Sequence, residues 1–124
     1  MRPPDWPERL ARLLDDWQGR DFVWGQGDCV QFARAVVTAV TGRALKVPRY
    51  RAREVRRLLQ QQDLAARVAA TLGTPAAPAL AQRGDVVLQG GALGVCLGAS
   101  VALRAPQRGL VICPLDHTAL CWPL

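Results

Sequence analysis

The sequence contains one histidine, one lysine and one tyrosine, and it has no long uninterrupted apolar run. A membrane-spanning helix needs about 18 to 20 consecutive apolar residues, so none is expected. The opening residues, MRPPDWPERL, also lack the apolar stretch of a secretory signal. We therefore expect a protein that is made and kept in the cytoplasm unless a particle carries it out.

The cysteines show no metal-binding pattern. None of the four cysteines forms a CxxC pair or lies beside histidines at ligand spacing, so neither a zinc site nor any other metal site is expected. Without a secretory signal the thiols should stay reduced. Cys96, Cys113 and Cys121 lie in apolar runs and are interpreted as small core residues. No cofactor motif is present, and only Cys29 has a different setting.

Positive charge is abundant and locally concentrated. The net charge is +6, and 15 of the 16 cations are arginine. Seven cations lie between positions 43 and 57, where Glu54 is the sole acid, so one face should be strongly positive. Specific nucleic-acid binding is not expected, because only Tyr50 offers stacking and no binding motif is recognisable. A solvated basic helix, or a docking surface for an acidic partner that includes Arg53, Arg56 and Arg57, fits better.

The first 73 residues have helical periodicity. Asp5 with Glu8 predicts a capped start to a helix that ends near Gly19, and Asp28 with Gln31 predicts a second helix that runs to about position 40. A basic third helix is expected over 53–62 and a fourth over 64–72, ended by Gly73.

From residue 83 onward the pattern changes to short β-type runs separated by turn residues, after an Ala/Pro linker at 74–82. The runs are DVVLQ, LGVCLG, SVALRA, GLVICPL and ALCWPL. Five short strands with local turns predict an antiparallel meander packed on the helices. The expected fold is one α+β domain over 1–124, because 124 residues form a single core.

Cys29 is the candidate nucleophile. It lies in the first turn of a predicted helix, directly after its capping residue, where the helix dipole favours the thiolate. The alternative is that Cys29 is one more small core residue, and the spacing alone does not decide between them.

The order of motifs resembles the NlpC-type papain-like superfamily. WGQGDCVQFARAVVTAVTG is similar to the nucleophile segment of those peptidases, RGDVVL to the strand that follows, and LGVCLG to the next strand. Trp24, with the C-terminal GLVICPL and Trp122, resembles in particular the small domains encoded in phage and prophage tail clusters. This resemblance implies a papain-like fold with Cys29 as nucleophile, and Trp24 as a packing residue of the loop or part of a binding groove.

The sequence also departs from that family. In the resemblance, Ala92 occupies the place of the catalytic histidine, and the third, orienting group falls near Val101 or Ala102. Alanine can neither accept nor return a proton, so the usual Cys-His pair cannot form there. The one histidine, His117, follows Asp116 and is typical of a solvated turn. The alternative is that the C-terminal segment brings His117 to Cys29 as a base.

Other polar residues near these motifs have structural interpretations. Asp28 is expected to cap the second helix. Asp85 is expected to make the turn into the first strand, with orientation of a catalytic group as the alternative.

Two functions follow from these features. The first is a tail-tip or tail-assembly component with a degenerate papain-like fold that docks onto other phage tail proteins, within a virion tail. The second is an active cysteine peptidase or amidase that cleaves peptidoglycan peptides, with Cys29 as nucleophile and His117 as base. A thiol-dependent role without hydrolysis is a third, weaker hypothesis.

Overall fold

Helices and one sheet make up the regular structure of the chain. The computed structural model describes residues 2–23, 27–45, 53 and 64–124. The helices are α1 (Trp6–Gln18), α2 (Cys29–Thr41) and α4 (Leu64–Leu72), with a 3-10 turn η1 (Pro78–Leu80); the strands are β1 (Val86–Gln89), β2 (Ala92–Cys96), β3 (Ser100–Leu103), β4 (Val111–Pro114) and β5 (Leu120–Trp122). The α+β class is confirmed. Within the described ranges, no helix has the length and apolarity to cross a membrane.

The sheet is antiparallel, with strand order β4-β3-β2-β1-β5. The first four strands form the expected meander, and Gly90 and Gly91, both at positive φ, make the tight turn between β1 and β2. β5 departs from the prediction, because it returns across the sheet to pair with β1 rather than continuing beside β4. Turn residues predict local hairpins, but they do not say which free edge a last strand joins.

The expected linker at 74–82 contributes to this edge. Ala76 and Cys121 exchange backbone hydrogen bonds, so the segment pairs with β5 instead of only connecting two halves.

Helix α2 begins and ends as its sequence predicts. The Asp28 side chain accepts a hydrogen bond from the Gln31 backbone N–H at 3.0 Å, and Gly42 ends the helix at a φ of 74°. The prediction for α1 is wrong in one detail. Asp5 does not cap it, because its backbone is not extended and its carboxylate pairs with Arg9.

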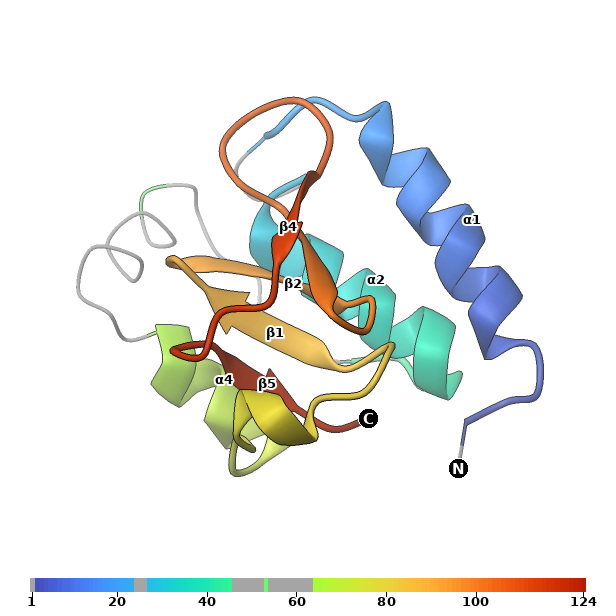
Figure 1. Ribbon diagram of the computed structural model, residues 1–124. Helices are drawn as coiled ribbons and strands as arrows, with labels where there is room; N and C mark the ends of the chain where they lie inside the picture. The colour runs from blue at the N-terminus through green and yellow to red at the C-terminus, as the bar shows by residue number, and fades with distance from the viewer. Residues whose placement is uncertain (1, 24–26, 46–52, 54–63) are drawn as a thin grey trace.

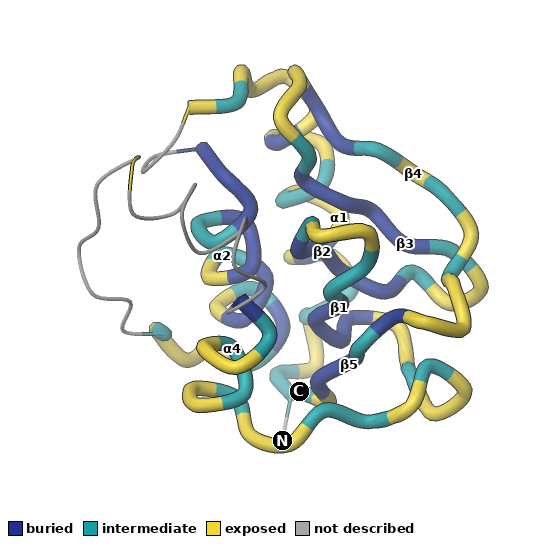
Figure 2. Tube along the Cα trace, turned by 90° about the vertical axis from the view of Figure 1, so that its left-hand side faces the viewer, coloured by how far each residue is buried: buried dark blue, intermediate teal, exposed yellow. Residues whose placement is uncertain are grey.

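Two apolar clusters cover the two faces of the sheet. α2 lies on one face, and α1 packs against α2 (Figure 1). The first cluster lies between these helices and the sheet and includes Trp17 and Phe32, whose rings meet edge to face at 5.1 Å. The second lies on the other face and includes Val87, Cys96 and Cys121. Figure 2 shows burial concentrated along α2 and the inner strands, whereas β4 is partly buried or exposed.

Asp85 joins the two ends of the chain. Its carboxylate accepts hydrogen bonds from the Arg2 guanidinium and from the Leu124 backbone N–H. It also closes the turn before β1, where it accepts from the Gln82 backbone N–H. The two termini therefore lie side by side (Figure 2), and Asp85 has the turn role that the sequence predicts.

Candidate functional site

The start of α2 places Cys29 against the sheet. Asp28 is fully buried and caps the helix, so Cys29 occupies the first helical position. The Cys29 residue is only 2% exposed and belongs to the first apolar cluster. Its thiol receives backbone hydrogen-bond stabilisation from Leu93 in β2 and from the N–H groups of Cys29 and Val30. Cys29 therefore lies at the start of the helix, as expected of a nucleophile, but its side chain is not accessible to solvent.

Burial decides the ionisation of this thiol. The pKa of Cys29 is raised to about 11, chiefly because burial desolvates the thiol and with a contribution from the negative charge of Asp28, while backbone groups of Leu93, Cys29 and Val30 act in the opposite direction. The decrease in pKa caused by these backbone groups is smaller than the increase caused by burial. A helix start favours a thiolate only where the sulfur keeps some solvation or a cationic partner.

Ala92 and Cys29 belong to opposite faces of the sheet. Side chains alternate along a strand, and Ala92 packs on the second cluster whereas Leu93 and Cys29 belong to the first. A histidine at position 92 would therefore point away from the thiol in this backbone. Val101 and Ala102, the places of the orienting group, are both fully buried and apolar.

His117 lies in the turn between β4 and β5. Its side chain is 94% exposed, and its Nδ1 pairs with the Asp116 carboxylate at 3.0 Å. Asp116 is itself held by the Thr118 backbone N–H, which holds the pKa of that carboxyl below its usual range. A side chain this exposed packs against almost nothing, so it does not contact a thiol that is buried in the core.

Sequence reasoning missed Arg104, which lies directly after β3 and is 1% exposed. Its guanidinium donates hydrogen bonds to four backbone carbonyls, those of Gly27, Arg20, Gly109 and Asp21. The guanidinium also lies over the Trp17 ring, at 5.1 Å from its centroid. Burial lowers the pKa of this guanidinium, but arginine stays charged in proteins.

Arg104 holds both sides of the Cys29 site. Its side chain binds the Gly27 carbonyl at 2.7 Å, two residues before Cys29. Its backbone N–H donates to the Leu93 carbonyl at 3.0 Å, beside the thiol. The one signal in the sequence is an arginine that ends an otherwise apolar strand, SVALRA.

A comparison with protein families places the whole chain in one of them. Residues 1–124 match the model of a family described as a domain of unknown function, DUF6950. The chain belongs to the DUF6950 family. No curated protein matches it.

Of the remaining binding candidates of this DUF6950 chain, the structure describes only one. Arg53 is exposed. Trp24, Arg56 and Arg57 lie outside the described residues, as does most of the helix expected over 53–62. The described residues contain no group of three side chains suited to hold a metal ion.

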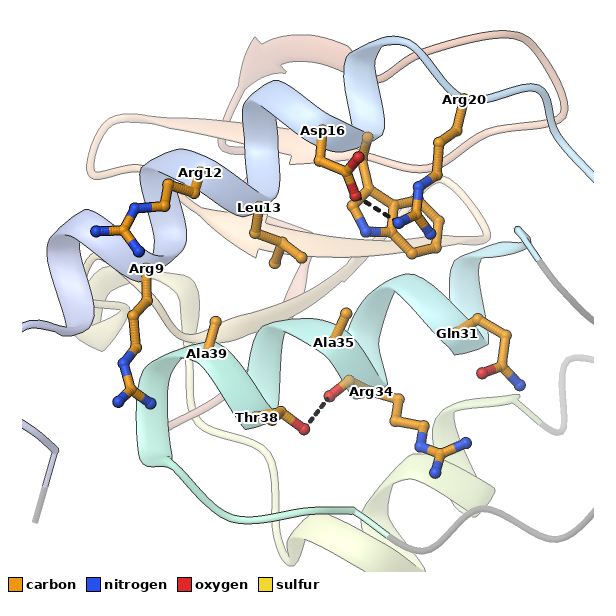
Figure 3. A pocket seen from close by; sticks show the side chains of 11 residues that line it. Arg9, Arg12, Leu13, Asp16, Arg20, Gln31, Arg34, Ala35, Thr38 and Ala39 are labelled. Atoms are coloured by element: carbon orange, nitrogen blue, oxygen red, sulfur yellow. Dashed lines mark hydrogen bonds and ion pairs between the residues drawn. The ribbon is translucent and has the colours of Figure 1, made fainter.

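This chain also has an open groove between α1 and α2, with a volume of about 680 Å³. Leu13, Ala35 and Ala39 line its floor, and Arg9, Arg12, Arg20 and Arg34 line its rims (Figure 3). Asp16 is the one acidic residue among the lining residues.

Proposed function

We propose that this chain is a degenerate papain-like domain of the NlpC type that acts by protein–protein docking in a phage or prophage tail. The observation that supports the proposal most strongly is the state of Cys29, a buried thiol whose pKa is raised to about 11. At neutral pH such a thiol is protonated, and the thiolate is the nucleophilic form.

The surroundings of Cys29 agree with a loss of catalysis. Catalysis by a cysteine needs a base within hydrogen-bond reach of the thiol. Ala92 packs on the other face of the sheet, and His117 is exposed in a turn beside Asp116. Arg104 supports the backbone around Cys29 from within the fold, whereas neither position 92 nor His117 brings a base to the thiol.

Charge reversal tests the docking role. Arg53→Glu, Arg56→Glu and Arg57→Glu together should abolish the incorporation of the chain into tail particles, because they reduce the net charge of the basic segment at 43–57 from +6 to zero. Arg67→Glu, Arg83→Glu and Arg108→Glu together are the matched control, since these three arginines are exposed and lie outside that segment. Unchanged incorporation of the first triple variant would count against docking through this segment.

The second candidate function is a cysteine peptidase or amidase on peptidoglycan peptides. The observation in its favour is that backbone groups of Leu93, Cys29 and Val30 lower the pKa of the Cys29 thiol against the effect of burial. An assay on muropeptides with the wild-type chain and Cys29→Ala decides between the two. We expect no cleavage above the Cys29→Ala background, and cleavage that depends on Cys29 would replace the docking proposal.

A further inference from the structure

The groove between α1 and α2 has an apolar floor with positive charge on both rims. Leu13, Ala35 and Ala39 are partly buried, so they expose apolar surface within the groove. Ala35 and Ala39 are four residues apart on one face of α2. Their short side chains leave room there for larger side chains of a partner.

The charges of the groove are only partly neutralised within the molecule. Arg9 pairs with Asp5 at 2.9 Å, and Arg20 pairs with Asp16. Arg12 and Arg34 make no ion pair with any residue in the described ranges 2–45 (24–26 excluded), 53 and 64–124. Both are exposed, so their charges are free to meet a partner's acids.

The placement of these two arginines argues for an extended partner rather than a small anion. Figure 3 shows Arg12 on the α1 rim and Arg34 on the α2 rim, with side chains that point away from each other. One phosphate or carboxylate cannot join them, but acidic residues on either side of a helix can. The described part of the groove offers no exposed aromatic ring, since Trp17 is 2% exposed, so base stacking of a nucleic acid finds no platform.

From this geometry we propose that the groove binds an acidic amphipathic helix of a partner protein. Apolar side chains of that helix seat over Ala35 and Ala39, and its acidic residues reach Arg12 and Arg34. The lining residues of α1 run from Arg9 to Trp17, which corresponds to a length of about 12 Å, or about two helical turns. The inference rests on the proposed docking role and gives it a second surface and a partner chemistry.

Two synthetic peptides of equal composition test the proposal. One has leucine at i, i+4 and i+7 spacing with glutamate elsewhere, and the other has the same residues shuffled so that no apolar face forms. Each has about 18 residues, because helices shorter than about 12 to 15 residues are marginal in water. Binding to the full chain is measured by fluorescence anisotropy, beside a labelled single-stranded oligonucleotide.

The amphipathic peptide should bind, and the shuffled one should bind about tenfold more weakly or worse, because both floor and rims are needed. The double variant Arg12→Glu with Arg34→Glu should bind the amphipathic peptide about tenfold more weakly or worse. The control pair Arg67→Glu with Arg108→Glu makes the same change in net charge at exposed sites outside the groove. It should leave binding within about threefold, as expected of long-range charge alone.

Several results overturn the proposal. They are no binding of the amphipathic peptide, equal binding of the shuffled peptide, an equal loss in the control pair, or preferred binding of the oligonucleotide through Arg12 and Arg34. Such a failure is separable from failure of the docking role. Incorporation into tail particles that still depends on Arg53, Arg56 and Arg57 would leave the docking role standing while the groove is excluded.

Discussion

Replacement of Arg104 by methionine tests how the Cys29 region is held. Methionine keeps much of the side-chain length but removes all the donors. Two of the four hydrogen bonds, those to the Gly27 and Gly109 carbonyls, are buried, and two are partly buried. A buried acceptor left unpaired costs about 1 to 3 kcal/mol. Water can replace the partly buried donors, and the desolvation cost of the charge disappears. The two buried acceptors together cost about 2 to 6 kcal/mol, and after these offsets the net expected loss is about 2 to 4 kcal/mol.

Urea unfolding of Arg104→Met measures this loss, with Arg108→Met as control, since the Arg108 side chain is 71% exposed. The control should change the free energy of unfolding by no more than about 0.5 kcal/mol. If Arg104→Met does not fold, Arg104→Lys keeps the charge with fewer donors and should lower amide hydrogen-exchange protection around residues 27–29 first. A loss below about 1 kcal/mol in Arg104→Met, with unchanged exchange in Arg104→Lys, would refute the reasoning.

Two further predictions concern the sheet and the thiol. Gly94→Ala should lower the free energy of unfolding by about 3 kcal/mol or more, because an added Cβ would lie 2.0 Å from the Ala102 carbonyl oxygen; Gly19→Ala, whose Cβ meets its nearest atom at 3.8 Å, is the control and should change it little. A mild effect in Gly94→Ala would show that the β2–β3 spacing is wrong. The wild-type chain should also lose stability relative to Cys29→Ala as the pH rises from about 9 to about 11. Over that window the unfolded thiol ionises while the folded one keeps its proton, and the loss should approach about 3 kcal/mol. Parallel pH curves for the two proteins would contradict the raised pKa.

Local signals in the sequence were sufficient for most elements. Asp28 begins α2 and Gly42 ends it, each through a hydrogen bond to a residue within four positions along the chain. The limits of α2 were therefore predictable from the sequence. Asp5 has the same residue type as Asp28 but a different backbone, with ψ near 14° instead of extended. Capping residues therefore predict a helix start only where the preceding chain can adopt the extended conformation.

The long-range features were beyond such signals. Arg104 binds carbonyls 77 to 84 residues away, and the one local signal, its place at the end of the apolar run SVALRA, does not identify those partners. β5 pairs with β1 at one edge of the sheet, and the turn residues between β4 and β5 do not specify which edge strand β5 joins. By contrast, the face of Ala92 was available from the sequence, because the alternation in ALGVC puts Ala92 with Cys96 and opposite Leu93 and Val95.

The pH dependence of Cys29 alkylation in the folded chain tests the central claim most directly. Mass spectrometry resolves Cys29 from the other three cysteines, which serve as internal references. The account predicts that Cys29 is labelled slowly near neutral pH and that its rate rises with an apparent pKa well above the free-thiol value of about 8.5, toward about 11. Fast labelling with an apparent pKa below about 7 would mean that the fold still activates the nucleophile, and the docking proposal would give way to the peptidase.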